Sequence, residues 1–149
     1  MKNLTTLILT FFIFNFTYAQ KLFDAIEDQD IEKVNKLIEK GADVNMQKDN
    51  GYNPLFSACA KGNKAIAELL INKGAKVNAE LKNGITSLVI VSQDGYYDIA
   101  VLLLKNKADP NLKDENGWTP IRFAARNGRA EIVKLLVGNG SEIDVRASD

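Results

Sequence analysis

The stretch NGWTPIRFAARNGRAEIVKLLVGNG, residues 116–140, predicts two short helices joined by a turn. Thr119 offers an N-cap oxygen and Pro120 suits a first helical turn, so the first helix is expected to begin there. Gly128 and Gly140 tolerate positive φ and are expected to follow the ends of the two helices. Apolar residues recur at helical spacing in both segments, which gives each helix one face to bury.

The same unit recurs along the chain with a period of thirty-three residues. Three sets of positions repeat at this spacing: Gly51, Gly84 and Gly117; Gly62, Gly95 and Gly128; and Asn45, Asn78, Asn111 and Asp144. A stack of similar units requires such a repeat, because each unit buries its apolar face only against its neighbours. We therefore predict a repeat domain at 20–149, with four units at 20–49, 50–82, 83–115 and 116–149.

These motifs resemble the ankyrin repeat over residues 21–149. The family's opening Gly-x-Thr-Pro-Leu is matched by Gly117-Trp118-Thr119-Pro120-Ile121, and its closing Gly-Ala-Asp-Val-Asn by residues 41–45. The resemblance implies an all-α solenoid of stacked helix–turn–helix units, each with a β-turn finger that projects sideways. Unit three departs from the pattern at Ser87, Val89 and Lys107. Lys107 replaces a glycine and is expected to cost stability if positive φ is needed there.

The two ends of the stack differ in polarity. When the units are aligned, each set of equivalent positions forms a column. Three columns that are largely apolar in the inner units are polar in the first unit, at Asp24, Lys33 and Lys36, which predicts a solvent-facing N-terminal cap. In the last unit Arg122 replaces an apolar residue, which is a plausible capping change. Three other residues of this end remain apolar: Ile121, Leu136 and Val137. We expect that face to be partly exposed and covered by the tail at 145–149; the alternative is a partner.

Residues 1–19 do not belong to the repeat. A short positive start, residues 1–3, precedes a thirteen-residue, mostly apolar run at 4–16, and Thr17 and Ala19 place small residues before a cleavage point. We interpret 1–19 as a secretory signal peptide cleaved after Ala19, because a membrane span needs ~20 apolar residues. The alternative is an uncleaved anchor. We thus expect a periplasmic or secreted protein that begins at Gln20, with no other membrane contact.

Composition argues against several classes of function. Nineteen basic residues balance nineteen acidic ones, which leaves no basic field for nucleic acid or an anionic membrane. Histidine, the commonest general base and metal ligand, is absent. The lone Cys59 is expected to be a buried small hydrophobe. No phosphate loop, nucleophile elbow or metal-ligand cluster is present. We expect a non-enzymatic monomer without catalytic residues, metal or cofactor.

Two rows of equivalent positions, one residue from each unit, are candidates for binding, and we call each row a ladder. The column after the first glycine of each unit holds Tyr52, Ile85 and Trp118, and the resemblance places it on the fingers, pointing toward the concave face. Large apolar or aromatic side chains there would anchor a partner. A second ladder, at the end of each first helix, runs from acidic in unit one to basic in unit four through Lys61, Asp94 and Arg126. The alternatives are packing between neighbouring fingers and an ordinary solvated face.

The leading hypothesis is a module that binds another protein through its concave face. Its anchors would be Tyr52, Ile85 and Trp118, with Lys61, Asp94 and Arg126 tuning specificity. The alternative is a stress-protective or inhibitory module that shields one periplasmic enzyme or toxin with the same residues. Tyr97, which starts the second helix of unit three with Tyr96, is expected to pack at the seam between units. The fold itself names no partner.

Overall fold

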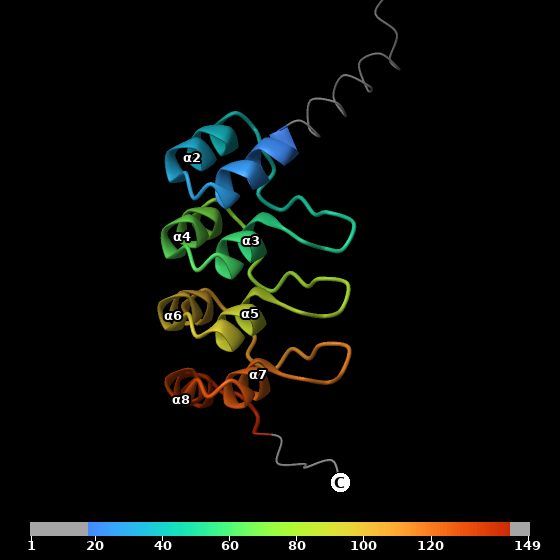
Figure 1. The fold of residues 1–149 in the computed structure, drawn as a ribbon, viewed down its shortest axis with the longest axis vertical. Helices are drawn as coiled ribbons and strands as arrows, with labels where there is room; N and C mark the ends of the chain where they lie inside the picture. The colour runs from blue at the N-terminus through green and yellow to red at the C-terminus, as the bar shows by residue number, and fades with distance from the viewer. Residues whose placement is uncertain (1–17, 144–149) are drawn as a thin grey trace, which may run out of the picture.

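The computed structural model describes residues 18–143, which form a stack of helical hairpins (Figure 1). The first helix covers residues 18–27. The others follow as α2 (Ile31–Glu39), α3 (Pro54–Ala60), α4 (Lys64–Asn72), α5 (Ser87–Asp94), α6 (Tyr97–Lys105), α7 (Pro120–Arg126) and α8 (Ala130–Gly138). The described part contains no strand, only an isolated β-bridge between Glu80 and Thr86. The predicted all-α solenoid is confirmed.

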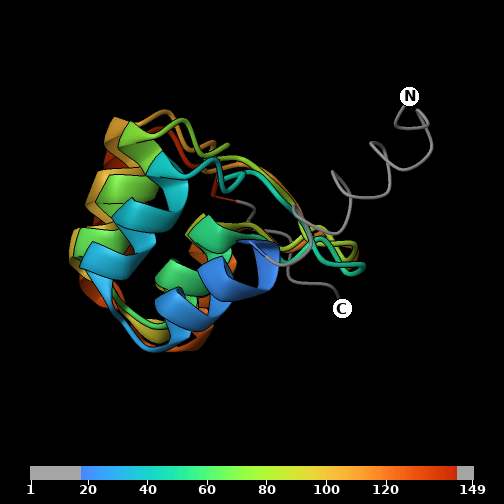
Figure 2. The ribbon, with the colours of Figure 1, turned by 90° about the horizontal axis from the view of Figure 1, so that it is seen from above.

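The helices form two layers, and three long loops project from one side of the stack. The inner layer consists of the helix at 18–27 with α3, α5 and α7, and the outer layer of α2, α4, α6 and α8 (Figure 1). Seen from above, the equivalent helices of successive units overlie one another, and the loops overlap in a single row (Figure 2). These loops, at residues 40–53, 73–86 and 106–119, are the fingers. The inner helices and the fingers together border the concave face.

Side-chain caps begin some of the helices but not α6, α7 or α8. The side-chain oxygens of Asn53 and Thr86 accept hydrogen bonds from the N–H groups of the third residues after them, which caps α3 and α5. Thr119 occupies the N-cap of α7, but its side chain makes no capping hydrogen bond, so the predicted role of its oxygen is wrong. Pro120 sits in the first turn as predicted. Lys107 has a φ of 66°, which confirms that a non-glycine residue adopts the left-handed conformation there.

The recurring asparagine column ties each unit to the next. The Asn45 amide donates to the Gly74 carbonyl at 2.9 Å and its oxygen accepts from Lys76 N–H at 2.8 Å. Asn78 and Asn111 repeat both contacts with the backbone of the following unit. One side chain thus satisfies a carbonyl and an N–H in loops that offer no helical partner. This pairing explains why asparagine recurs at this position.

The core runs continuously through the stack. Its fully buried members are mainly leucine and isoleucine from both layers: Leu22, Ile26, Leu55, Ile66, Leu70, Leu88, Ile99, Leu103 and Leu136. Asp24, Lys33 and Lys36 are exposed, which confirms the polar first unit. At the other end Val137 is exposed, as expected of a partly exposed face, whereas Ile121 and Leu136 are buried. The tail at 145–149 lies outside the described residues. No helix within 18–143 is long and apolar enough to cross a membrane.

Candidate protein-binding site

The fingers are held to one another by backbone contacts. Lys82 N–H donates to the Asn50 carbonyl, and Glu115 N–H donates to the Asn83 carbonyl, each at 2.9 Å. Gly51 lies so close to the next finger that an added Cβ would come within 2.9 Å of the Glu80 carbonyl oxygen and Leu81 Cα. Close stacking and a positive φ together require glycine at this position. The side chains that follow these glycines are therefore displayed on a preformed surface.

Tyr52 packs within an aromatic cluster at the first finger. Its ring centroid lies 5.9 Å from that of Phe23 and 5.3 Å from that of Phe56, the latter edge-on. The Lys48 ammonium lies 4.3 Å from the Phe23 ring centroid and 5.3 Å from the Tyr52 ring centroid. These contacts hold Tyr52, which is half-buried, against its own and the preceding unit. Packing thus accounts for much of the apolar character at this position.

Trp118 lies beside two arginines at the third finger. Its ring centroid is 5.3 Å from that of Phe123, while Cζ of Arg122 and Cζ of Arg126 lie 4.2 Å and 5.1 Å from it. The two arginines are four residues apart on α7, so they share one face of that helix. Cation–π attraction favours guanidinium groups over an indole ring. The last finger and α7 thus form a cluster of one aromatic ring and two cations.

A hollow of about 420 Å³ opens between the second and third fingers. It brings together three of the six predicted binding residues, Ile85, Trp118 and Arg126. The rest of its lining is an aromatic ring and polar finger residues: Asn83, Asp114, Glu115, Asn116 and Phe123. Tyr52, Lys61 and Asp94 do not line it. The hollow therefore joins the aromatic ladder and the charged ladder only at the C-terminal half of the stack.

Sequence reasoning missed Asp114, which shapes the third finger. Its carboxylate accepts hydrogen bonds from the N–H groups of Asn116 at 3.0 Å and Trp118 at 2.7 Å. In the first two fingers the equivalent bond is made by Asn50 to Tyr52 N–H and by Asn83 to Ile85 N–H. Asp114 occupies a column that otherwise holds Lys48 and Leu81, and this change was the available signal. Trp118 is thus fixed through its backbone by a buried carboxylate.

Lys61 and Asp94 have partners outside the hollow. Lys61 forms an ion pair with Glu27 of the preceding unit, and this contact lowers the pKa of the Glu27 carboxyl and raises that of the Lys61 ammonium. The Ser57 hydroxyl donates to the same carboxylate at 3.0 Å. Asp94 accepts a hydrogen bond from the Gln93 amide at 3.3 Å. Part of the acidic-to-basic gradient is therefore neutralised across the first seam.

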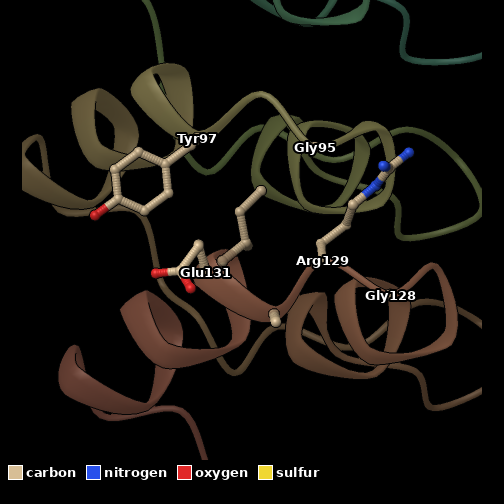
Figure 3. A pocket seen from close by; sticks show the side chains of 7 residues that line it. Gly95, Tyr97, Gly128, Arg129 and Glu131 are labelled. Atoms are coloured by element: carbon tan, nitrogen blue, oxygen red, sulfur yellow. The ribbon is translucent and has the colours of Figure 1, made fainter.

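A second hollow, of about 680 Å³, lies at the turns between the two helices of units three and four (Figure 3). Gly95, Tyr97, Arg129 and Glu131 are among its lining residues, and Arg129 Nε donates to the Gln93 carbonyl at 3.1 Å. Tyr97 is 44% exposed and lines this hollow between units three and four, so it packs only partly at the seam. Its neighbour Tyr96, which is also partly exposed, packs against unit two, because its ring lies where a Cβ on Gly62 would be.

The described residues show no constellation with evident chemistry. Within 18–143, no three histidine, cysteine, aspartate or glutamate side chains are grouped so as to hold a metal ion. Cys59 is fully buried, as predicted, and burial raises the pKa of its thiol to about 12. Such a thiol stays protonated at neutral pH and is a poor nucleophile.

Comparison with known proteins places the chain in a family. The family described as ankyrin repeats (3 copies) matches residues 22–114 and, in an overlapping second match, residues 81–147. Together these matches cover most of the chain, which therefore belongs to the ankyrin-repeat family. No curated protein matches it. Ankyrin repeats generally serve as protein–protein interaction modules.

Proposed function

We propose that this ankyrin-repeat protein is a non-enzymatic interaction module that acts outside the cytoplasm and binds a partner protein through its fingers and concave face. The hollow lined by Ile85, Trp118 and Arg126 carries the proposal. It combines an aliphatic side chain, an indole ring and a guanidinium group, and tryptophan and arginine are enriched among residues that dominate binding energy.

The rigidity of the fingers supports this proposal. The backbone hydrogen bonds between fingers and the Asp114 bonds to the third finger fix the position of Trp118 before any partner arrives. A preformed surface loses little conformational freedom on binding, so more of the contact energy contributes to affinity. Trp118 is accordingly the principal anchor, Ile85 lies beside it, and Tyr52 extends the apolar ladder toward the first unit. Lys61 and Asp94 contribute to specificity from the edge of this surface.

The location outside the cytoplasm rests on the sequence of residues 1–19. Residues 1–17 of this segment lie outside the described residues, and the helix at 18–27 continues through the expected cleavage point after Ala19. Mass spectrometry of the protein from fractionated cells tests this part of the proposal. A chain that begins at Gln20 in the periplasm or medium is expected. A membrane-bound chain that retains residues 1–19 would instead show the uncleaved anchor.

Site-directed photo-crosslinking in the native cells tests the binding surface. A photoreactive phenylalanine analogue at residue 85 is expected to yield a specific adduct with one protein. The same analogue at exposed residue 137 on α8, away from the fingers, is the matched control. Adducts from residue 137 but not from residue 85 would place the interface elsewhere. If the captured protein is a single enzyme or toxin whose activity falls on binding, the module has the shielding role.

A further inference from the structure

The Arg122–Trp118–Arg126 cluster presents two cations in a fixed arrangement. Both guanidinium groups lie within about 5 Å of one indole ring, at the 4.2 Å and 5.1 Å given above. Both arginines are exposed, and they project from neighbouring turns of the same face of α7. Stacking on an indole ring restricts the flexible arginine side chain and orients its plane of N–H donors. The donors are thus partly ordered before any ligand binds.

Neither arginine has an acidic partner among residues 18–143. The ion pairs in this part of the chain are Lys33–Asp28, Lys61–Glu27 and Lys134–Glu131. Like charges four residues apart on a helix repel one another, so the pair destabilises α7 slightly until an anion approaches. A carboxylate matches the guanidinium fork, which donates two parallel hydrogen bonds to its two oxygens. An anionic group on a ligand would therefore complement this cluster.

The surroundings favour a short acidic peptide segment over a polyanion. The adjoining hollow has an apolar side made by Ile85, Trp118 and Phe123, which suits a hydrophobic side chain next to the bound carboxylate. Its other side carries Asp114 and Glu115, which repel any anion placed against them, so a single carboxylate held at the arginines is favoured over the successive phosphates of a nucleic acid. The chain as a whole has a formal net charge of zero and supplies no extended basic field.

We infer that the Arg122–Trp118–Arg126 cluster binds an aspartate or glutamate side chain of the partner, with an adjacent apolar residue of the same segment seated in the hollow beside Ile85. This inference rests on the proposed function, because it names the chemistry of the segment that the concave face recognises. It makes the two arginines specificity-determining residues, each donating to the incoming carboxylate.

Selection from a displayed library of random twelve-residue peptides on the chain from Gln20 onward provides the probes. The enriched peptides are expected to carry an acidic residue next to an aliphatic or aromatic one. Binding is then titrated by the fluorescence of Trp118, which is the only tryptophan in the chain and lies in the cluster itself. Replacing the acidic residue of the peptide with its amide is expected to weaken binding about tenfold or more, as for loss of a charge-assisted hydrogen bond.

Variants of the protein separate the cluster from general electrostatics. The Arg122→Gln, Arg126→Gln double variant is expected to lose at least about tenfold in affinity, and Arg122→Lys, which keeps the charge but not the fork, to lose part of it. Arg129→Gln is the matched control, because that arginine lines the other hollow. The affinity of this variant for the peptide should stay within about twofold of the parent's. Since both cluster arginines are exposed, the double variant should melt within a few degrees of the parent.

Three outcomes would overturn the inference: selection that yields no binders or no acidic bias, a double variant that binds as tightly as the parent, or a single-stranded oligonucleotide that binds the cluster more tightly than the peptides. The residue-85 crosslink, repeated in the double-variant background, distinguishes the two proposals. Loss of the adduct supports both proposals. An adduct that persists contradicts the carboxylate site but is still consistent with the proposed function. Absence of an adduct in the parent chain counts against the proposed function itself.

Discussion

The aromatic clusters at the first and third fingers share a column of the repeat but differ in the cations beside them. Within residues 18–143, the first has an unpaired lysine over its rings and a nearby lysine–glutamate ion pair, and the third has two unpaired arginines. At the first finger Lys61 is paired with Glu27, and Lys48 lies over the rings of Phe23 and Tyr52. At the third finger Arg122 and Arg126 flank Trp118 with no acidic partner in the described part of the chain. The repeat places an aromatic ring at both sites. Both rings are half-buried, and the residues specific to each unit decide which charged groups surround them.

The largest expected effect comes from removing the scaffold that both clusters share. Leu103 on α6 is fully buried, so Leu103→Ala should lower the free energy of unfolding by ~2–5 kcal/mol through lost burial and a cavity. Urea denaturation followed by circular dichroism measures this change. Val137→Ala, at an exposed site on α8, is the control and should change the value by less than ~0.5 kcal/mol. Similar losses in both variants would show that the stack lacks the continuous core described above.

The two rings should respond oppositely to truncation. Trp118→Ala should weaken partner binding by ~2 kcal/mol or more, because binding energy concentrates on anchors of this kind. It should cost less stability than Tyr52→Ala, because the indole has one aromatic contact within the described residues, with Phe123. Tyr52→Ala should instead lower the free energy of unfolding by ~1–3 kcal/mol, since it removes the ring contacts with Phe23 and Phe56. The affinity for the partner and the melting temperature, measured for both variants, test this difference between the rings. The distinction between the clusters fails if Trp118→Ala unfolds the protein and leaves binding intact.

Glycine-to-alanine changes test whether contact with a following finger adds to the cost of replacing a finger glycine. Gly51 and Gly117 both have positive φ, so each change should cost ~1–2 kcal/mol from backbone strain alone. Only at Gly51 would the new methyl group also meet the next finger, whereas Gly117 has open space around it. Gly51→Ala should therefore be clearly the more destabilising in parallel denaturant titrations. Equal losses would mean that contact between fingers adds nothing.

The smallest expected effect is on how the stability of the fold depends on pH. Lys61 lowers the pKa of Glu27 in the folded chain, so this ion pair stabilises the fold above the ordinary pKa of the carboxyl and stops doing so as pH falls through the lowered value. Glu27→Gln should make the protein slightly less stable at pH 7, and the difference from the parent should vanish in acid. Denaturant midpoints at pH 7 and at about pH 3 measure it. A difference that grows toward low pH would have the wrong sign for a paired carboxylate.

Column alignment predicted most of the fold because the helices and fingers are made of local signals. The proline at the start of α7 and the glycines after most of the helices act within a few residues, so they can be read directly from the chain. The asparagine column was visible as a repeat, but its cause was not, because each side chain bonds the backbone about thirty residues away. The positive φ at Lys107 could be anticipated because this residue takes the position of a glycine in the other units.

The candidate site was less predictable because it depends on unlike neighbours. The alignment placed Tyr97 at the seam between units, whereas it is Tyr96 whose ring packs against Gly62 of unit two, and both tyrosines stay partly exposed. Arg122 was noticed only as a polar change in an apolar column, although its guanidinium lies over the indole of Trp118 on the adjoining finger. Thr119 has the right residue type for a cap, yet its side chain makes no capping bond. Such contacts follow from side-chain directions that spacing alone does not specify.

The asparagine ties also determine how freely the units can diverge. Each tie runs from one side chain to the main chain of the following unit, where Gly74, Lys107 and Gly140 supply the carbonyl and Lys76, Asp109 and Glu142 supply the N–H. Every residue type has a carbonyl, and all but proline have an N–H, so a substitution in the receiving loop that keeps the backbone conformation leaves the connection intact. Neighbouring units can therefore carry different surface residues, such as the tyrosine of one finger and the tryptophan of another, with the same joint between them.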